Sequence, residues 1–189
     1  DEALELELEE LKKDPNVSLV TGRSLYINSQ GKVCYLNSKQ QLTVSISCAK
    51  WKDYNDYVSS TRSVDYLSNN FGSYDSLAPY NYISNGYLIK RSFLDKVLPF
   101  KEQAPMEDYW LMLQLSKISK FKFIDKPLFY YRQHDTNTIK NKPKMKKMGD
   151  MTLSYERTLY LKEDTKDMNE AYLEYKNKYI HNAVVEYDR

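Results

Sequence analysis

The sequence predicts an α/β fold, a mixed sheet flanked by helices with a helical C-terminal tail. Helix-like and strand-like stretches alternate along the chain, with helices over 2–13, 91–97 and 107–118 and strands over 17–36, 82–90 and 121–134. A further helical pattern runs from about residue 147 to 187. We therefore divide the chain into a domain of residues 1–142 and a helical extension of residues 143–189.

The first helix and the two strands after it follow local sequence rules. Residues 2–13 place Leu4, Leu8 and Leu11 on one stripe, the pattern of an amphipathic helix. "DPN" ends this helix, and "NSQGK" separates two strand-like runs as a hairpin turn would. Residues 37–78 show no strong period and predict short helices and loops.

In the second half of the domain the sequence pattern predicts a strand, two helices and a pair of short strands. Ser92 is a candidate cap for the helix in "RSFLDKV", which would turn Phe93, Val97 and Leu98 inward. The helix over 107–118 follows the loop "KEQAPM", and "DKP" reads as a turn between two short strands.

The composition is that of a globular protein, with 41% hydrophobic and 29% charged residues. Its 18 tyrosines suit half-buried surfaces that contact sugars or peptides, although a general bias in the genome explains them equally well. A net charge of +2, without a basic stripe interleaved with aromatic residues, argues against nucleic-acid binding. Cys34 and Cys48 have no CxxC spacing, so we expect a reduced, cytoplasmic protein.

Two adjacent carboxylates, Glu107 and Asp108, begin the helix over 107–118. Acidic side chains at this position commonly cap a helix. Alternatively, Asp108 is a general base that takes the proton of a sugar hydroxyl as it attacks an anomeric carbon. Glu107 would then orient that hydroxyl or hold a basic partner, and we expect the helix dipole to keep Asp108 ionised.

His134, one of two histidines, follows the last strand-like run. A neutral imidazole nitrogen there could bind a divalent metal that neutralises a leaving diphosphate. The alternative is an ordinary surface or core histidine, which is also our interpretation of His181 in the tail.

The segment "MEDYWLMLQLSKISKFKFIDKPLFYYRQHDTNT" resembles the late part of family-2 inverting glycosyltransferases with the GT-A fold. In that family an E-D pair and a Leu-rich helix precede "K-F-x-F-I-x-x-P-L-x-x-Y-R-x-H-x-x-N". The upstream runs "LEELKKDPNVSLVTGRSLYINSQGKV" and "NYISNGYLIKRSFLDKVLPF" are similar to the family in order and spacing, so the resemblance covers roughly residues 4–140.

The resemblance implies a partial GT-A fold and an inverting sugar transfer. The donor would be a nucleotide-diphosphate sugar and the acceptor a glycan or a lipid-linked glycan. Asp108 would be the catalytic base and His134 a ligand of Mn²⁺ or Mg²⁺. The family's nucleotide-binding half, with its Asp-x-Asp, has no counterpart in these residues, so we expect no turnover by this chain alone.

Four further positions are candidates for substrate binding. The resemblance places Asn85 and Gly86 beside the acceptor and donor sugars, where glycine permits a close backbone approach; a bulge or turn is the alternative. Trp110 would stack on a sugar face or belong to the core. Arg132 would contact the diphosphate or form a salt bridge without a catalytic role.

The C-terminal part of the chain leaves several partners open. "KNKPKMKK" could touch an anionic surface at the inner face of a membrane, or be a solvated charge run. The tail would pack on the domain, form a dimer with a second chain, or lead into another domain. Two functional alternatives to the enzyme are a non-catalytic interaction module and a carbohydrate-binding domain.

Overall fold

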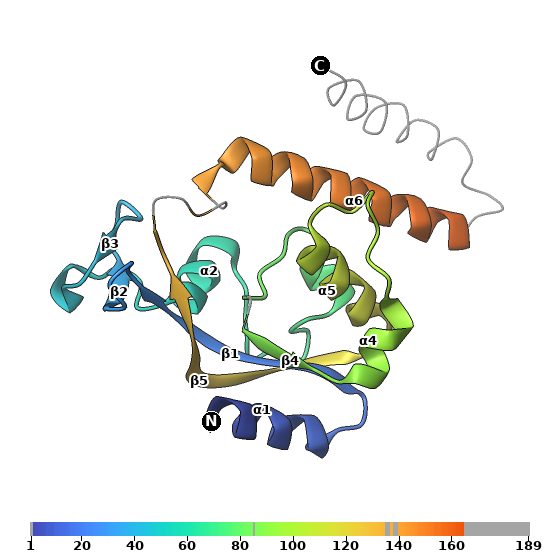
Figure 1. Cartoon of the computed structure of the whole chain (residues 1–189), viewed down its shortest axis with the longest axis horizontal. Helices are drawn as coiled ribbons and strands as arrows, with labels where there is room; N and C mark the ends of the chain where they lie inside the picture. Colours follow the sequence, from blue (N-terminus) through green and yellow to red (C-terminus); the bar gives the residue numbers. More distant parts are fainter. Residues whose placement is uncertain (1, 85, 135–136, 138–139, 165–189) are drawn as a thin grey trace.

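A mixed β-sheet organises the chain in the computed structural model, which describes residues 2–84, 86–134, 137 and 140–164 (Figure 1). In this part of the chain the order of strands is β3-β2-β1-β4, and β5 pairs with the other edge of β1. The strands are β1 (Val17–Ile27), β2 (Val33–Leu36), β3 (Leu42–Thr43), β4 (Tyr87–Ile89) and β5 (Lys120–Arg132). This arrangement confirms the α/β class and the mixed sheet.

β1 is the central strand of the sheet. It runs parallel to β5 over its whole length, and at its other edge it pairs antiparallel with β4 and then with β2. Leu19 and Val20 are fully buried although they point to opposite faces of the sheet. A strand covered on both faces favours apolar residues, as in "VSLV" at its start, where the one polar residue, Ser18, is buried with its hydroxyl hydrogen-bonded to that of Ser119.

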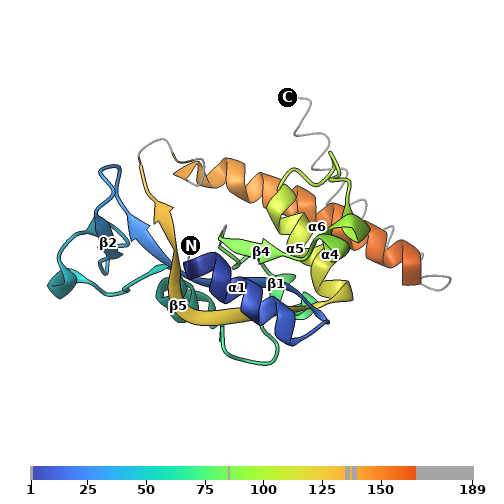
Figure 2. The same cartoon turned by 60° about the horizontal axis from the view of Figure 1, so that its bottom comes forward.

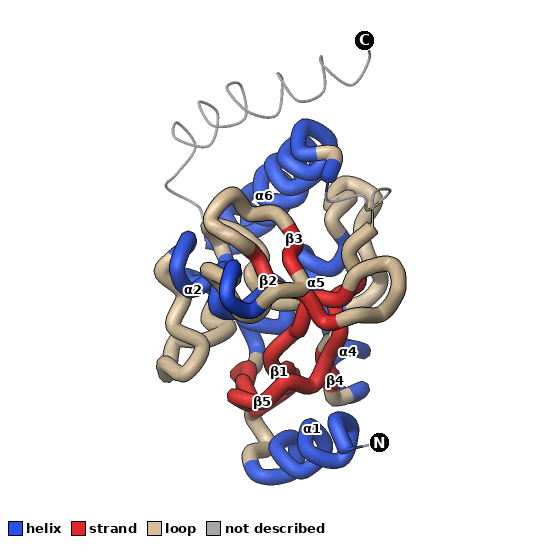
Figure 3. The backbone as a smooth tube through the Cα atoms, turned by 90° about the vertical axis from the view of Figure 1, so that its left-hand side faces the viewer, coloured by secondary structure: helices blue, strands red, loops and turns tan. Residues whose placement is uncertain are grey.

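Helices cover both faces of this sheet. α1 lies on one face, while α2, α5 and α6 lie on the other (Figure 3), and in Figure 2 α1 crosses in front of the strands. No helix in the described residues is both long and apolar enough to cross a membrane. The helices are α1 (Glu2–Lys13), α2 (Tyr54–Arg62), α3 (Tyr74–Leu77), α4 (Arg91–Val97), α5 (Glu107–Ile118) and α6 (Lys142–Asp164), with a 3₁₀ helix η1 (Ile46–Cys48).

The larger core lies on the face that α5 covers. It contains fully buried aliphatic side chains of α5 together with aromatic side chains from β5 and the preceding loops. A smaller cluster on the opposite face joins Leu11 of α1 to Val17 and Val20 of β1. α5 is therefore held between the sheet and α6, and its N-terminus has a fixed position relative to the strand ends.

Several sequence predictions are confirmed. α1, α4 and α5 form over the expected residues, and short helices and loops fill most of residues 37–78. The turn between β1 and β2 contains Gly31 at φ +80°, a left-handed conformation that glycine adopts without strain. The C-terminal helix is present as α6, and residues 165–189 of the predicted tail lie outside the described residues.

The predicted pair of strands around "DKP" is one strand. β5 stays paired with β1 across this stretch by means of register shifts between Gly22 and Ser24. Pro127 is tolerated because β5 is an edge strand among the described residues, where it pairs with β1 on one side only. Asp125 lies within the shift between Gly22 and Arg23 and accepts a hydrogen bond from Arg23 Nε at 2.5 Å, so the irregularity is anchored to β1.

Two other local predictions are wrong. The strand expected over 82–90 comprises only Tyr87–Ile89, because Tyr82 turns into the core and its hydroxyl accepts a hydrogen bond from the Gly72 N–H. Ser92 does not cap α4, which begins at Arg91 with Lys90 in the N-cap position. Tertiary contacts, which local sequence rules do not include, decide both boundaries.

The stripe of leucines on α1 is not the buried face of the helix. Leu4 and Leu8 are 53% and 46% exposed, whereas Leu11 is 4% exposed and Glu7 is 1% exposed. α1 is thus rotated so that a carboxylate, rather than two of the three leucines, faces the sheet. Periodicity identified the helix correctly but did not identify its buried face.

We predict different losses of stability for two leucines of α1. Leu11→Ala should lower the free energy of unfolding by roughly 2–4 kcal/mol, because it opens a cavity beneath Val17 and Val20. Leu8→Ala, the matched control one turn away, should change it by less than about 0.5 kcal/mol. Urea unfolding followed by circular dichroism measures both, and equal losses would contradict the observed orientation of α1.

Glu7 makes stability depend on pH. Burial raises the pKa of its carboxyl from 4.5 to about 7. Because the folded state binds this proton more tightly than the unfolded chain does, stability should fall as the pH rises from about 4.5 to about 7.

Glu7→Gln tests this coupling. The amide carries no charge, so the variant should lose the decline and should be more stable than the parent at pH 8 by up to about 3 kcal/mol. Thermal unfolding between pH 4 and 8 provides the measurement, with Glu9→Gln on the exposed side of α1 as the control. An unchanged pH profile in Glu7→Gln would show that another group is responsible.

Candidate functional site

A cleft of about 600 Å³ brings together the N-terminus of α5, the end of β5 and the beginning of α6. Glu107 and Asp108 both line it, and Ser24 and Tyr54 reach it from β1 and α2. Residues far apart in the sequence therefore form one surface around the acid pair. We call this cleft the acidic cleft.

Asp108 is partly buried in the acidic cleft, whereas Glu107 is exposed. Asp108 Oδ1 accepts a hydrogen bond from the Tyr109 N–H at 2.7 Å. Burial raises the pKa of Asp108 above its ordinary value, the Tyr109 hydrogen bond opposes this, and the negative charge of Glu107 adds to it. Burial is thus the largest effect on this carboxyl group, and the expected ionisation of Asp108 at neutral pH stays a prediction.

The first turn of α5 is fixed by neighbouring helices. Its N-cap residue, Met106, has no side-chain acceptor for the free helix N–H groups. Instead, the Met106 N–H donates to Thr152 Oγ1 of α6 at 3.0 Å. On the other side, the Tyr109 hydroxyl donates to the carbonyl oxygens of Leu77 and Ala78. These contacts determine where Asp108 lies.

Tyrosine rings form an aromatic wall beside Asp108. The rings of Tyr54 and Tyr131 are 6.0 Å apart, and Tyr26 lies behind them at 6.5 Å and 5.9 Å. Burial raises the pKa of Tyr54 and of Tyr131, and the negative charge of Asp108 contributes to both shifts. These hydroxyls therefore stay protonated at neutral pH and remain available as hydrogen-bond donors.

Polar side chains from β1 and the loop before β4 also line the cleft. Ser24 Oγ donates to Ser84 Oγ at 2.7 Å, and the Ser24 N–H donates to Asn55 Oδ1 at 2.9 Å. Thr21 Oγ1 donates to the carbonyl oxygen of Gly86 at 2.5 Å, which ties the loop before β4 to β1. The cleft thus offers hydroxyl groups that are already oriented by hydrogen bonds.

Gly86 is required by a close contact within the cleft. A Cβ added there would lie 2.0 Å from Cγ of Phe129, so the ring of Phe129 occupies the space a side chain would need. We expected Gly86 to permit a close approach, and the approaching group in the structure is Phe129 of β5. Asn85, its predicted companion, lies outside the described residues.

Trp110 and Arg132 do not line the acidic cleft. Trp110 is 3% exposed, so in this structure it belongs to the core and presents no open ring face to a sugar. Arg132 Nη1 donates to the carbonyl oxygens of Asn28 and Ser29 at 3.0 and 3.2 Å, which joins the end of β5 to the β1–β2 turn.

His134 is exposed and lies outside the lining of the cleft. Its backbone N–H donates to Asn137 Oδ1 at 2.7 Å, and Asn137 itself lines the cleft. Among the described residues, no group of three or more His, Cys, Asp or Glu side chains could hold a metal ion. A divalent metal held by His134 together with an Asp-x-Asp on another segment stays a prediction.

Sequence reasoning missed several residues of the cleft. Ser24, Tyr54 and Ser84 come from separate segments and carry no local signal. Met145 and Met148 of α6 also line the cleft. Their i, i+3 spacing indicates one helix face, but nothing in the sequence shows what that face covers.

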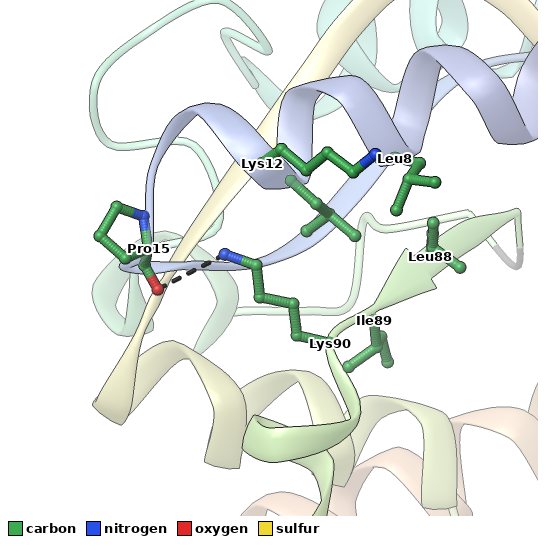
Figure 4. Close-up of a pocket in the computed structure, with 7 residues that line it drawn as sticks. Leu8, Lys12, Pro15, Leu88, Ile89 and Lys90 are labelled. Atoms are coloured by element: carbon green, nitrogen blue, oxygen red, sulfur yellow. Dashed lines mark hydrogen bonds between the residues drawn. The ribbon is translucent and has the colours of Figure 1, made fainter.

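A second, apolar groove of about 440 Å³ lies between α1 and β4 (Figure 4). Leu8, Leu88 and Ile89 line it, and Lys90 Nζ closes one end by donating to the carbonyl oxygen of Asp14 at 2.8 Å. The described residues that line this groove include no carboxylate or imidazole. The acidic cleft is therefore the better candidate for chemistry.

We predict that Thr152 supports the acid pair. Thr152→Val should leave the Met106 N–H buried without an acceptor and should lower stability by about 1–3 kcal/mol. Thr152→Ser, which retains the hydroxyl, should recover most of the loss, and Thr158→Val, six residues later on α6, is the control. A Thr152→Val variant as stable as Thr152→Ser would rule out this role.

Comparison with known proteins gave no family assignment. Neither the protein-family models nor the curated proteins searched include a match to this chain.

Proposed function

We propose that this chain carries the acceptor side of an inverting glycosyltransferase of the family-2 type, with Asp108 as the general base. The observation that carries the proposal is the position of Asp108, a partly buried carboxylate with a raised pKa in a cleft lined by hydroxyl, amide and aromatic groups. A raised pKa strengthens a carboxylate as a proton acceptor.

The reaction assigns a separate task to each member of the acid pair. The acceptor hydroxyl transfers its proton to Asp108 while its oxygen forms a bond to the anomeric carbon of the donor. The bond from that carbon to the diphosphate oxygen breaks on the opposite face, so the configuration inverts and the nucleoside diphosphate leaves with the electron pair. Glu107, which is exposed and lines the cleft, orients the acceptor by hydrogen bonding in this proposal.

The cleft walls suit a carbohydrate acceptor. Tyr54 and Tyr131 offer ring faces and hydroxyl groups to a sugar, whose faces are rich in C–H groups. Ser84 and Asn81 supply polar groups for sugar hydroxyls on the other side. The donor-binding residues and their Asp-x-Asp have no counterpart among residues 1–189, so the transfer assay requires a protein that also contains a donor-binding half.

We predict that Asp108→Asn in such a complete enzyme abolishes nearly all transfer, by at least about a thousandfold in kcat, and leaves donor binding unchanged. In the parent enzyme, kcat/KM should rise with pH through the pKa of Asp108, because the base acts in its deprotonated form. Release of nucleoside diphosphate measures the rate, and isothermal titration measures donor binding.

Glu102→Gln, an exposed change five residues before Glu107, is the matched control. Transfer retained by Asp108→Asn would refute the assignment of the base. A carbohydrate-binding domain without catalysis remains the second candidate, because the aromatic wall would bind a sugar equally well without a reaction. That candidate requires that the protein with a donor-binding half binds a glycan but transfers no sugar to it from any nucleotide-sugar donor.

A further inference from the structure

One side of the acidic cleft is made of methionines. Met106 directly precedes the acid pair, and Met145 and Met148 lie one turn apart on α6. All three side chains are partly exposed, in contrast to Met112, which is fully buried in the core. We call Met106, Met145 and Met148 the methionine wall.

The methionine wall is held in place by close packing of α6 on the start of α5. A Cβ added at Gly149 would lie 3.4 Å from Met106 Sδ, so α6 approaches Met106 closely at this point. The hydrogen bond from the Met106 N–H to Thr152 Oγ1 fixes the same contact. The wall and Asp108 are therefore positioned by one set of contacts.

A ligand made only of hydroxyl-bearing sugar rings does not suit this wall. Sugar hydroxyls placed against thioether and methylene groups would lose hydrogen bonds to water without replacement. An alkyl or aryl group placed there would instead be removed from water, and methionine adapts its shape to such groups. Ser24 and Ser84, which also line the cleft, supply hydroxyl groups as partners for a sugar.

We infer that the acceptor is amphiphilic: its sugar hydroxyl reaches Asp108 while an alkyl or aryl group attached to that sugar packs on the methionine wall. This inference rests on the proposed function and selects an acceptor with an apolar aglycone over a free glycan. The acid pair and the wall are adjacent, since Met106 is two residues from Asp108. The apolar group therefore lies on the sugar that reacts or on its immediate neighbour.

The test measures binding to the chain itself and needs neither donor nor turnover. Hexyl β-D-glucoside and methyl β-D-glucoside are titrated separately into protein labelled with ¹³C at the methionine methyl groups. The hexyl glucoside should shift the resonances of Met106, Met145 and Met148 and leave Met112 unchanged. Its Kd should be at least about tenfold lower than that of the methyl glucoside, because the hexyl chain is buried.

Met148→Gln keeps the length of the side chain but makes the wall polar. It should raise the Kd of the hexyl glucoside at least about fivefold and leave that of the methyl glucoside unchanged. Lys144→Gln, an exposed change on the same helix, is the control and should alter neither value.

Three outcomes would overturn the inference. These are equal affinities for the two glucosides, no binding of either one, and hexyl binding without shifts of the methionine-wall resonances. The last result would place the alkyl chain elsewhere, for example in the groove between α1 and β4. None of these outcomes bears on the transfer lost in Asp108→Asn, so failure of the inference and failure of the proposed function can be told apart.

Discussion

The pairing of β1 on both of its edges is the constraint on which the rest of the structure depends. Parallel pairing with β5 carries the chain from the end of α5 to Tyr131, on the aromatic wall of the acidic cleft. Antiparallel pairing with β4 holds the loop that contains Ser84 and Gly86. Because Ser24 belongs to β1 itself, the central strand also contributes directly to the cleft.

The chemistry of the cleft follows from a competition at Asp108. The N-terminus of a helix favours an ionised carboxylate, and so does the hydrogen bond from the Tyr109 N–H. Burial beside tyrosine rings and the charge of Glu107 favour the protonated form and prevail. The result is a carboxyl group whose pKa lies above the ordinary value for an aspartate.

α6 takes part in the site through its packing as well as through its methionines. Glu156 is fully buried on this helix, where Lys117 forms an ion pair with its carboxylate and Gln114 donates a hydrogen bond to it. The Glu156 carboxylate is removed from water, which is costly for an isolated charge, and the exposed Lys117 supplies its counter-charge. This polar contact and the Thr152 hydrogen bond together determine how α6 lies on α5.

The sequence by itself determined the elements that depend on near neighbours. The α/β class, the hairpin at Gly31, the bounds of α5 and the acid pair at its start all follow from turn residues, periodicity and helix-end preferences. The tertiary structure alone decided which faces are buried: Glu7 rather than Leu8 on α1, Trp110 in the core, and Met145 and Met148 in the cleft. Burial depends on packing against elements that are distant in the sequence. The continuity of β5 through Pro127 likewise depends on a distant partner, because β1 is more than 100 residues away.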